Sequence, residues 1–314
     1  MLIERDSLPV TYDIVAEGLA FPEGPVAMPD GSILLVEIAG GALTRIAKDG
    51  SVARVARLDG GPNGAAMGPD GWMYVCNSGG WRYGHEQLAD GRLIQRPIGQ
   101  SATPGWIERV CCADGRVEHL YDCCDGVLLQ SPNDLVFDTQ GGFYFTDHGK
   151  RSEATLGLGV VYYGHADGRP LVRVADQLVT PNGIGLSADQ HVLYVAETTP
   201  RRILAFDIDS PGRVCKAKWP APAGGRLVVA LPGFNSLDSM AIGADGHIYV
   251  ASLINGGFWE IDPGVSARHF SIDDPFTTNL CFGRGEDQSI YVTLSATGRL
   301  ARLSWKVQGM RLAY

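Results

Sequence analysis

A polar residue recurs at the start of six short β-hairpins along this 314-residue chain, and no other feature constrains the fold as strongly. The leading residues are Glu23, Asn63, Asn133, Asn182, Asp238 and Asn279, at spacings of 40, 70, 49, 56 and 41 residues. A short apolar or alternating run follows each of them, such as Ile33–Glu37 or Phe143–Asp147. Repeats of this length built from short strands are typical of propeller blades. We therefore predict an all-β fold, a six-bladed β-propeller with four antiparallel strands per blade.

Tight turns separate the predicted strands. In four repeats an aspartate lies seven residues after the leading residue, at positions 30, 70, 189 and 245. Asp-Gly sequences supply the positive φ that such hairpins need. The first blade is then predicted to contain strands near 24–28, 32–37, 42–46 and 51–57. In this order, the loops between second and third strands lie at the same end as the leading residues.

The whole chain, 1–314, is expected to be one propeller domain, because an internally repeated β protein can reach this size without dividing. Ring closure needs a strand from one terminus, so that no edge stays unpaired. Residues 10–16 are predicted to be the outermost strand of the sixth blade, and residues 309–313 are the competing candidate.

Composition narrows the classes of partner. The formal net charge of −9 argues against nucleic acid and anionic membranes. No apolar run has the length of a membrane span, and the first residues do not resemble a signal peptide, so a cytoplasmic protein is expected. A homo-oligomer remains open.

Radial symmetry would bring the six leading side chains together as a ring of oxygens at one end of a central channel. Two of them carry charge, Glu23 and Asp238, and the other four are asparagines. Carboxylate and amide oxygens suit Ca²⁺, which takes six to eight oxygen ligands. The ring contains no histidine or cysteine, which disfavours zinc and copper. One divalent metal is predicted, with Ca²⁺ favoured. Asp134 should point away from this ring by strand alternation.

Two insertions should lie over the ring. The longer covers about 77–105 and contains Trp81, Tyr83 and His85, which we predict to contact the substrate together with Asn63. An aromatic surface loop packed on itself is the alternative. The second insertion starts at Asp147 and places His148 near the rim, as a proton shuttle or a substrate contact. A solvated loop histidine is the alternative there.

These motifs resemble the senescence marker protein/gluconolactonase (regucalcin-like) family of six-bladed, calcium-dependent lactonases. The motifs are Phe21–Pro25, Pro132–Asp134, Pro181–Gly183 and Asp238–Ser239, and the resemblance covers about residues 12–305. The runs 135–147 and 192–199 are especially similar to the staphylococcal drug-responsive lactonase branch. The resemblance implies a metal held by Glu23, Asn133, Asn182 and Asp238. Because some family members prefer other metals, Zn²⁺, Fe²⁺, Mn²⁺ and Mg²⁺ stay open.

The resemblance implies hydrolysis of a lactone to a hydroxy acid, with the metal polarising the carbonyl and a water activated by the metal or by Asp238. Asn133 and His148 would complete the catalytic set. Sugar-lactonase members carry an arginine where this chain has Ser131, so the substrate contact there differs and a less hydroxylated lactone or ester is expected. A phosphotriesterase with the same cage and a noncatalytic binding propeller are the alternatives.

Overall fold

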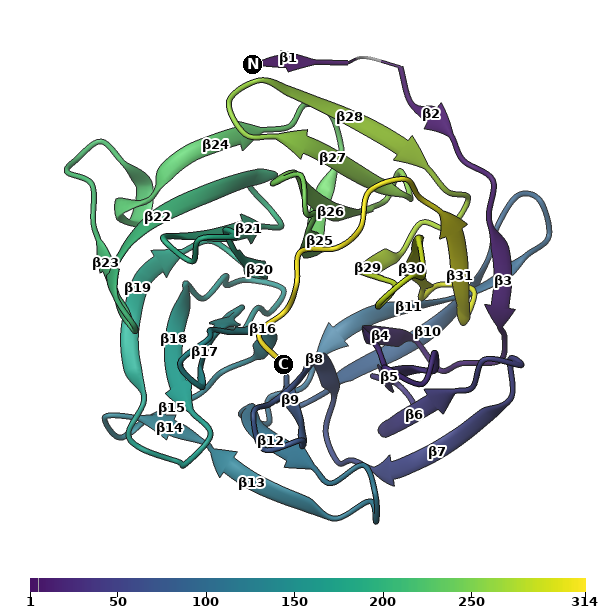
Figure 1. Ribbon diagram of the computed structural model, residues 1–314, viewed down its shortest axis with the longest axis horizontal. Helices are drawn as coiled ribbons and strands as arrows, with labels where there is room; N and C mark the ends of the chain where they lie inside the picture. The colour runs from purple at the N-terminus through teal and green to yellow at the C-terminus, as the bar shows by residue number, and fades with distance from the viewer. Residues whose placement is uncertain (5) are drawn as a thin grey trace.

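The computed structural model describes residues 1–4 and 6–314 and confirms the predicted propeller: six sheets surround a central channel (Figure 1). Blade one contains β4 (Pro22–Ala27), β5 (Ile33–Glu37), β6 (Ala42–Ile46) and β7 (Val52–Arg57). Blade two contains β8 (Pro62–Met67), β9 (Met73–Asn77), β12 (Trp106–Val110) and β13 (Val117–Tyr121). Blade three contains β16 (Pro132–Phe137), β17 (Gly142–Asp147), β18 (Gly159–His165) and β19 (Val172–Leu178).

The remaining blades follow the same order. Blade four contains β20 (Pro181–Leu186), β21 (Val192–Glu197), β22 (Arg202–Ser210) and β24 (Arg226–Ala230), with β23 (Arg213–Cys215) and the 3₁₀-helix η1 (Pro222–Gly224) inserted. Blade five contains β25 (Ser236–Ile242), β26 (Ile248–Leu253), β27 (Phe258–Asp262) and β28 (Ser266–Ser271). Blade six contains β29 (Thr277–Phe282), β30 (Ser289–Leu294), β31 (Arg299–Ser304) and β3 (Asp13–Ala16). Two hairpins lie outside the blades: β10 (Trp81–Gln87) with β11 (Leu93–Gln100), and β14 (Cys123–Cys124) with β15 (Val127–Leu128).

The N-terminal segment closes the ring, as predicted for residues 10–16: β3 pairs antiparallel with β31. The sequence pattern did not predict β1 (Leu2–Ile3) and β2 (Leu8–Pro9), which pair parallel with β28. The competing C-terminal segment instead crosses the channel (Figure 1), where Gly309 forms a bridge to Gly243. In the described part of the chain, no helix has the length and apolar character needed to cross a membrane.

The core lies between the blades, and strand alternation explains why the second strands read as continuous apolar runs. Phe143 and Phe145 of β17 pack into the cluster shared with blade two, which includes Tyr74. Tyr144, between them, packs into the cluster shared with blade four, which includes Leu193. Successive residues of a strand point to opposite faces, and both faces are covered here by a neighbouring blade.

The four repeated aspartates lie in the hairpin turns at the end of the channel opposite the leading residues. Each accepts a hydrogen bond from the backbone N–H two residues later, at 3.0–3.2 Å. Such side-chain-to-backbone bonds mimic a turn and fix the hairpin. The aspartates of the repeat therefore have a structural role, distinct from that of the leading residues.

A second set of repeated side chains accepts hydrogen bonds at the end of the channel where the leading residues lie. Glu37, Asn77, Asp147 and Glu197 close the second strands of blades one to four. Each accepts from backbone N–H groups in the segment that enters its blade, for example Gln130 N and Ser131 N, both 2.7 Å from the Asp147 carboxylate. Buried backbone donors need such partners. These bonds hold the chain just before each leading residue.

Candidate metal centre and its cover

The six leading residues all lie at one end of the inner strands and are all buried, with exposed fractions of 1–8%. Every inner strand has a register irregularity at this point, for example between Glu23 and Val26 in β4 and between Leu237 and Met240 in β25. Bulges of this kind re-aim side chains and are common beside functional sites. Repetition of the bulge in six blades gives six equivalent positions around the channel.

Glycines that follow three of the leading residues permit close contact between neighbouring blades. A Cβ added at Gly24 would lie 2.7 Å from the Asn63 carbonyl oxygen, and one at Gly183 would lie 2.6 Å from the Asp238 carbonyl oxygen. A Cβ at Gly64 would lie 2.5 Å from the Asn133 carbonyl oxygen. At these three positions, the Glu-Gly and Asn-Gly pairs therefore bring the backbone after one leading residue against the leading residue of the next blade.

Three oxygens of the ring have no hydrogen-bond partner among the described residues. They are Glu23 Oε1, Asn133 Oδ1 and Asn182 Oδ1, all buried. The Asn182 amide nitrogen donates to Thr198 Oγ1 at 3.2 Å, which leaves its oxygen free. Buried polar atoms without partners are rare and need an explanation. A cation with hard oxygen ligands fits this set, because each atom is an acceptor only.

Asn279 has a different environment, which the sequence pattern could not reveal. Its Nδ2 donates to Glu23 Oε2 at 2.7 Å, and its Oδ1 accepts from Leu280 N at 2.7 Å. Both ends of this amide are therefore engaged. Asn279 holds the Glu23 carboxylate in place, so that Oε1 remains the free oxygen.

Three carboxyl groups share the buried space of the ring. Burial, followed by repulsion from Asp238 and Asp134, raises the pKa of Glu23 well above its ordinary value. Burial also raises the pKa of Asp238 to about 8, although a hydrogen bond from Asn182 opposes the shift. Crowded buried carboxylates disfavour one another unless a cation compensates them. The electrostatics therefore also fit a bound cation.

Asp134 was expected to point away from the ring, and its side chain lines the channel on the side of the ring opposite the strap. Burial raises its pKa to about 7, and its charge also raises the pKa of Glu23. The bulge between Pro132 and Leu135 keeps Asp134 at the channel next to Asn133, where strict alternation would turn it towards a neighbouring blade. Asp134 Oδ1 accepts from the N–H of Leu135 at 2.9 Å, so it is partly satisfied by its own strand.

The predicted insertion is a β-hairpin, β10 (Trp81–Gln87) and β11 (Leu93–Gln100), which we call the strap. It leaves blade two and reaches the loops of blade six, where Gln95 N donates to the Ala296 carbonyl at 2.8 Å. Arg92 holds the same end by an ion pair of 2.8 Å to Asp273, from the segment that joins blades five and six. The strap therefore spans part of the ring end of the channel, rather than being an isolated surface loop.

Tyr83 is a strap residue close enough to the ring for the charges of Glu23 and Asp238 to act on its hydroxyl. Its aromatic ring lies 4.8 Å from that of Phe21, between centroids. Burial, with the charges of Glu23 and Asp238, raises the pKa of the Tyr83 hydroxyl well above its ordinary value. That hydroxyl is buried and has no hydrogen-bond partner within the described chain. Tyr83 thus offers a donor above the two charged ring residues.

The base of the strap joins the blade-three loop through Gln100. Its Nε2 donates to Ser131 Oγ at 2.8 Å, and its Oε1 accepts from Arg151 N at 2.9 Å. Ser131 is 1% exposed, and its hydroxyl contacts the strap through this hydrogen bond. Lys150 Nζ donates to the Ser78 carbonyl at 2.8 Å, and burial lowers the pKa of Lys150 to about 8.

His148 is buried beneath this junction rather than solvated. Its backbone N–H donates to the Ser131 carbonyl at 2.9 Å. Burial lowers the pKa of its imidazole to about 4, so the ring is neutral near pH 7. Its Nδ1 is buried and has no partner in the described residues.

The structure separates the remaining aromatic residues of the insertion. Trp81 is half-buried at the start of the strap, and His85 is exposed further along it. Trp106 belongs instead to blade two, where it stacks on His119 with ring centroids 5.2 Å apart. The contacts of Phe21 with Tyr83, of Gln100 with Ser131 and of Lys150 with Ser78 were not predicted, because each joins separate parts of the chain.

A second group of potential metal ligands lies near the hairpin turn of blade five, away from the ring. The ligand atoms of Asp245, His247 and Glu260 all lie within 4.8 Å of one another. Glu260 already binds Arg268 at 2.8 Å and Tyr249 Oη at 3.0 Å. Protein partners thus satisfy this cluster, which contrasts with the free oxygens of the ring.

Comparison with known proteins gives a consistent result. A model of the SMP-30/Gluconolactonase/LRE-like region matches residues 21–296. Lactonase drp35 of Staphylococcus epidermidis is 33% identical over 167 residues, which cover 53% of this chain and 49% of that protein. Lactonase drp35 of a bovine Staphylococcus aureus strain is 37% identical over 167 residues, with the same coverage. The match thus spans about half the length of these relatives.

Solved structures share the fold. A gluconolactonase from Xanthomonas campestris superimposes with a TM-score of 0.72 at 21% identity, covering 98% of this chain and 96% of that one. Regucalcin from Agrobacterium tumefaciens, a calcium-binding protein, gives a TM-score of 0.68 at 17% identity, covering 99% and 100%. With the family model extending over most of its length, this chain belongs to the SMP-30/gluconolactonase/LRE-like family.

Proposed function

We propose that this protein is a metal-dependent lactonase that hydrolyses a cyclic ester to a hydroxy acid. The observation that carries the proposal is the set of three buried, partnerless oxygens beside Asp238, at the end of the channel that the strap covers. The relatives named lactonases, and the family match, support the reaction class.

Glu23, Asn133, Asn182 and Asp238 would hold the ion, because these residues combine two carboxylates with two amide oxygens freed from other bonds. Such a donor set favours Ca²⁺, and Zn²⁺, Fe²⁺, Mn²⁺ and Mg²⁺ are the alternatives. When bound, the ion supplies Lewis-acid chemistry that polarises an ester carbonyl.

The chain's own residues then bind the lactone and move protons. Asp238 is proposed as the proton acceptor, since a carboxylate that uses one oxygen for the ion keeps a second one for the attacking water. His148 is neutral near pH 7 with a free Nδ1, so it can exchange a hydrogen bond with substrate or water. The Tyr83 hydroxyl is proposed to donate to a substrate oxygen, and the strap excludes bulk water above the ring.

The proposal is tested by hydrolysis assays on three substrates: an aromatic lactone, gluconolactone and a phosphotriester. Each assay is run on protein stripped by chelator and on protein to which single divalent metals have been returned. We expect metal-restored cleavage of at least one lactone. Cleavage of the phosphotriester alone would favour the same site used as a phosphotriesterase. No hydrolysis in any metal-loaded sample would favour a noncatalytic binding propeller.

Asn63 is predicted to line the substrate pocket rather than to bind the metal. Its side-chain oxygen is not one of the buried oxygens that lack partners, although it leads blade two beside the strap. We expect Asn63→Ala to lower kcat/KM by about tenfold, through one lost hydrogen bond to the substrate, while calcium content stays normal by elemental analysis. The variant Asp238→Ala is expected to lose its metal, and an equally complete loss in Asn63→Ala would show that Asn63 is a metal ligand instead.

Gly183→Ala is predicted to damage the ring through the backbone. The new Cβ would lie 2.6 Å from the Asp238 carbonyl oxygen, so β25 must move. Overpacking of this kind costs about 1–3 kcal/mol in the free energy of unfolding. We expect a lower Tm and weaker Ca²⁺ binding by calorimetry. Gly246→Ala is the control, because its φ of +82° adds backbone strain with no atom within 4 Å; equal loss of Ca²⁺ affinity in both variants would contradict the explanation.

A further inference from the structure

The channel contains a second chamber on the side of the ring opposite the strap. A cavity of about 570 Å³ lies between the inner strands and the C-terminal segment 308–314. Small-molecule sites commonly have volumes of about 300–1,000 Å³ and apolar walls with few polar groups. The chamber has the size for a ligand, and the activity proposed above does not use it.

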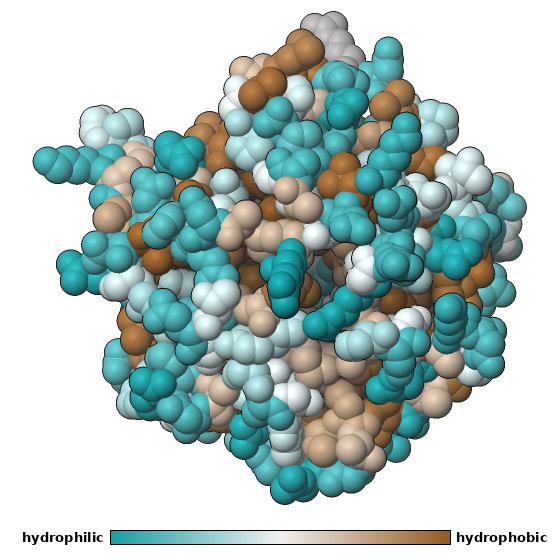
Figure 2. Space-filling model, viewed as in Figure 1, coloured by the Kyte–Doolittle hydropathy of each residue, from teal (hydrophilic) through white to brown (hydrophobic). Residues whose placement is uncertain are grey.

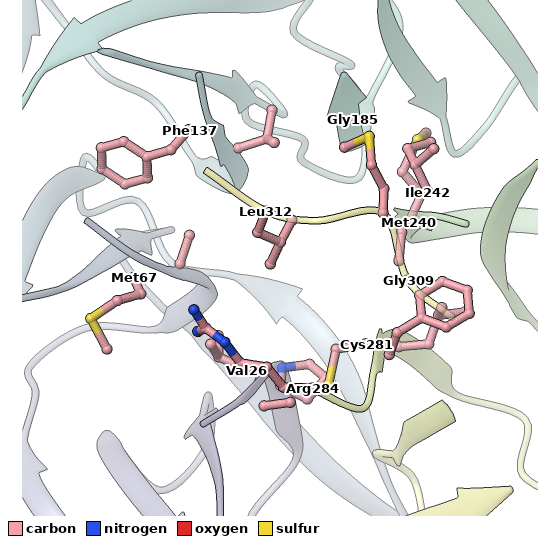
Figure 3. Close-up of a pocket in the computed structure, with 18 of the residues that line it drawn as sticks. Val26, Met67, Phe137, Gly185, Met240, Ile242, Cys281, Arg284, Gly309 and Leu312 are labelled. Atoms are coloured by element: carbon pink, nitrogen blue, oxygen red, sulfur yellow. The ribbon is translucent and has the colours of Figure 1, made fainter. Parts of the chain in front are cut away.

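Apolar side chains form much of the wall of this chamber, and Asp134 and Asn279 are among its polar lining residues. Figure 3 shows Phe137 and Met67 on one side, Met240 and Ile242 on the other, and Leu312 of the C-terminal segment between them. Water is held well only where it finds two to four polar partners, whereas apolar cavities favour apolar ligands. The interior therefore fits an alkyl or aryl group.

The mouth of the chamber carries positive charge. Arg284 lines the cavity (Figure 3), and so does Arg311. Neither guanidinium has a hydrogen bond or an ion pair with any described residue. The nearby Asp287 carboxylate is engaged with Tyr291 Oη at 2.8 Å. Figure 2 shows this face, with strongly hydrophilic side chains over its centre and apolar atoms between and around them.

The C-terminal segment covers the chamber. Ala244 N donates to the Gln308 carbonyl and Met310 N to the Ile242 carbonyl, both at 2.8 Å. Near its end, the Tyr314 ring meets Phe137 edge-on with centroids 5.8 Å apart. Gln308 Nε2 also donates to the Gly285 carbonyl at 3.2 Å, and Met310, Ala313 and Tyr314 pack against the cores of the blades. Arg311 and Leu312 are exposed, and a terminal segment with exposed residues opens locally at a lower free-energy cost than the blades do. A ligand could therefore enter from this face.

We propose that this chamber binds a small amphipathic carboxylate, with its alkyl or aryl part among the apolar walls and its carboxylate on Arg284 at the mouth. Guanidinium groups without partners match a carboxylate in both charge and geometry. The inference does not rest on the proposed lactonase activity, because neither the four proposed metal ligands nor the strap lines the chamber.

Decanoate is the probe, and its binding to the full chain is measured by calorimetry. Saturable binding is expected, with Arg284→Gln weakening it by about fivefold or more and Met67→Trp abolishing it by filling the cavity. Arg54→Gln, on the exposed outer strand of blade one, is the matched control and should bind as wild type does. Decanol should bind wild type and Arg284→Gln equally, since it lacks the charge.

Asp238→Ala and Tyr83→Ala distinguish the chamber from the ring end, and both should leave decanoate binding unchanged. Absence of saturable binding to wild type would overturn the proposal. Loss of binding in Tyr83→Ala with full binding in Arg284→Gln would also overturn it, because the ligand would then lie beneath the strap. If Met67→Trp fails to fold, as judged by circular dichroism, the Arg284→Gln comparison with decanol still decides.

Discussion

Asp238→Ala is expected to abolish stoichiometric metal binding, with Ca²⁺ affinity falling by at least about 100-fold. Loss of residues that merely support metal ligands already costs about 10–100-fold in affinity, and Asp238 is one of only two charged residues in the proposed cage. Hydrolysis should fall by about 1,000-fold or more, because the proposed proton acceptor is lost together with the ion. Elemental analysis after gel filtration and calorimetric titration with Ca²⁺ measure the binding.

The stability of the same variant gives a readout that does not depend on turnover. Burial, followed by repulsion from Asp238, raises the pKa of Glu23, so removal of Asp238 removes one part of the electrostatic cost of the metal-free ring. We expect metal-free Asp238→Ala to have a Tm at least equal to that of metal-free wild type. Added Ca²⁺ should raise the Tm of wild type, since a ligand stabilises the state it binds, and should not raise that of the variant.

Asp49→Ala is the matched control, since it removes an exposed carboxylate from a turn of blade one. It should retain wild-type metal content and the Ca²⁺-dependent rise in Tm. Full metal content in Asp238→Ala would rule out the proposed ligand set. A normal Ca²⁺ response combined with lost hydrolysis would keep Asp238 as a proton acceptor and move the metal elsewhere.

The blades could be predicted from sequence because their determinants are local. The apolar run of β17 and the Asp-Gly turn at Asp70 each specify a strand or a hairpin within a few residues. The ring followed from the same repeat, since rotation of one unit places equivalent residues around one axis. Closure by β3 followed from the need to pair the last edge.

Features that depend on contacts between distant segments could not be predicted. The bulge at Asn133 and Asp134 keeps both side chains at the channel, and simple alternation missed this. The strap was expected as a loop, although Asp90-Gly91 lies at its centre and Trp81, Tyr83 and His85 stand at alternate positions before it, which is a local hairpin signal. Its span to Ala296 depends on a partner roughly 200 residues away in the sequence, and propensity rules contain no such information.

The glycines after the leading residues could have predicted the close contacts between neighbouring blades. Gly24, Gly64 and Gly183 follow their leading residues directly, and each lies against backbone of the next blade. Glycine where a second backbone approaches closely is a known pattern. The acceptors that end the second strands, such as Asp147 and Glu197, were equally visible in the repeat. Both features could have indicated how neighbouring blades are held at the ring.

The strap is expected to set substrate selectivity, so that kcat/KM for an aromatic or alkyl lactone exceeds that for gluconolactone by tenfold or more. Tyr83 packs against Phe21 beside the ring, and the half-buried Trp81 stands at the start of the strap. Ser131 has no guanidinium for sugar hydroxyls, and its own hydroxyl is occupied by Gln100. Aromatic contacts contribute about 0.5–1.5 kcal/mol beyond their buried area, and 1.4 kcal/mol corresponds to a tenfold change.

Single variants separate the contribution of the aromatic side chains of the strap from that of the Tyr83 hydroxyl. Tyr83→Phe keeps the aromatic side chain and should lower kcat/KM for all lactones alike, because the donor above the ring is lost. Tyr83→Ala and Trp81→Ala should instead narrow the preference for the aromatic lactone by about tenfold each. Trp219→Ala is the control, since this side chain is 91% exposed and should leave every rate unchanged. A wild-type preference for gluconolactone, or selectivity untouched in both strap variants, would reduce the strap to a structural brace held by Arg92 and Asp273.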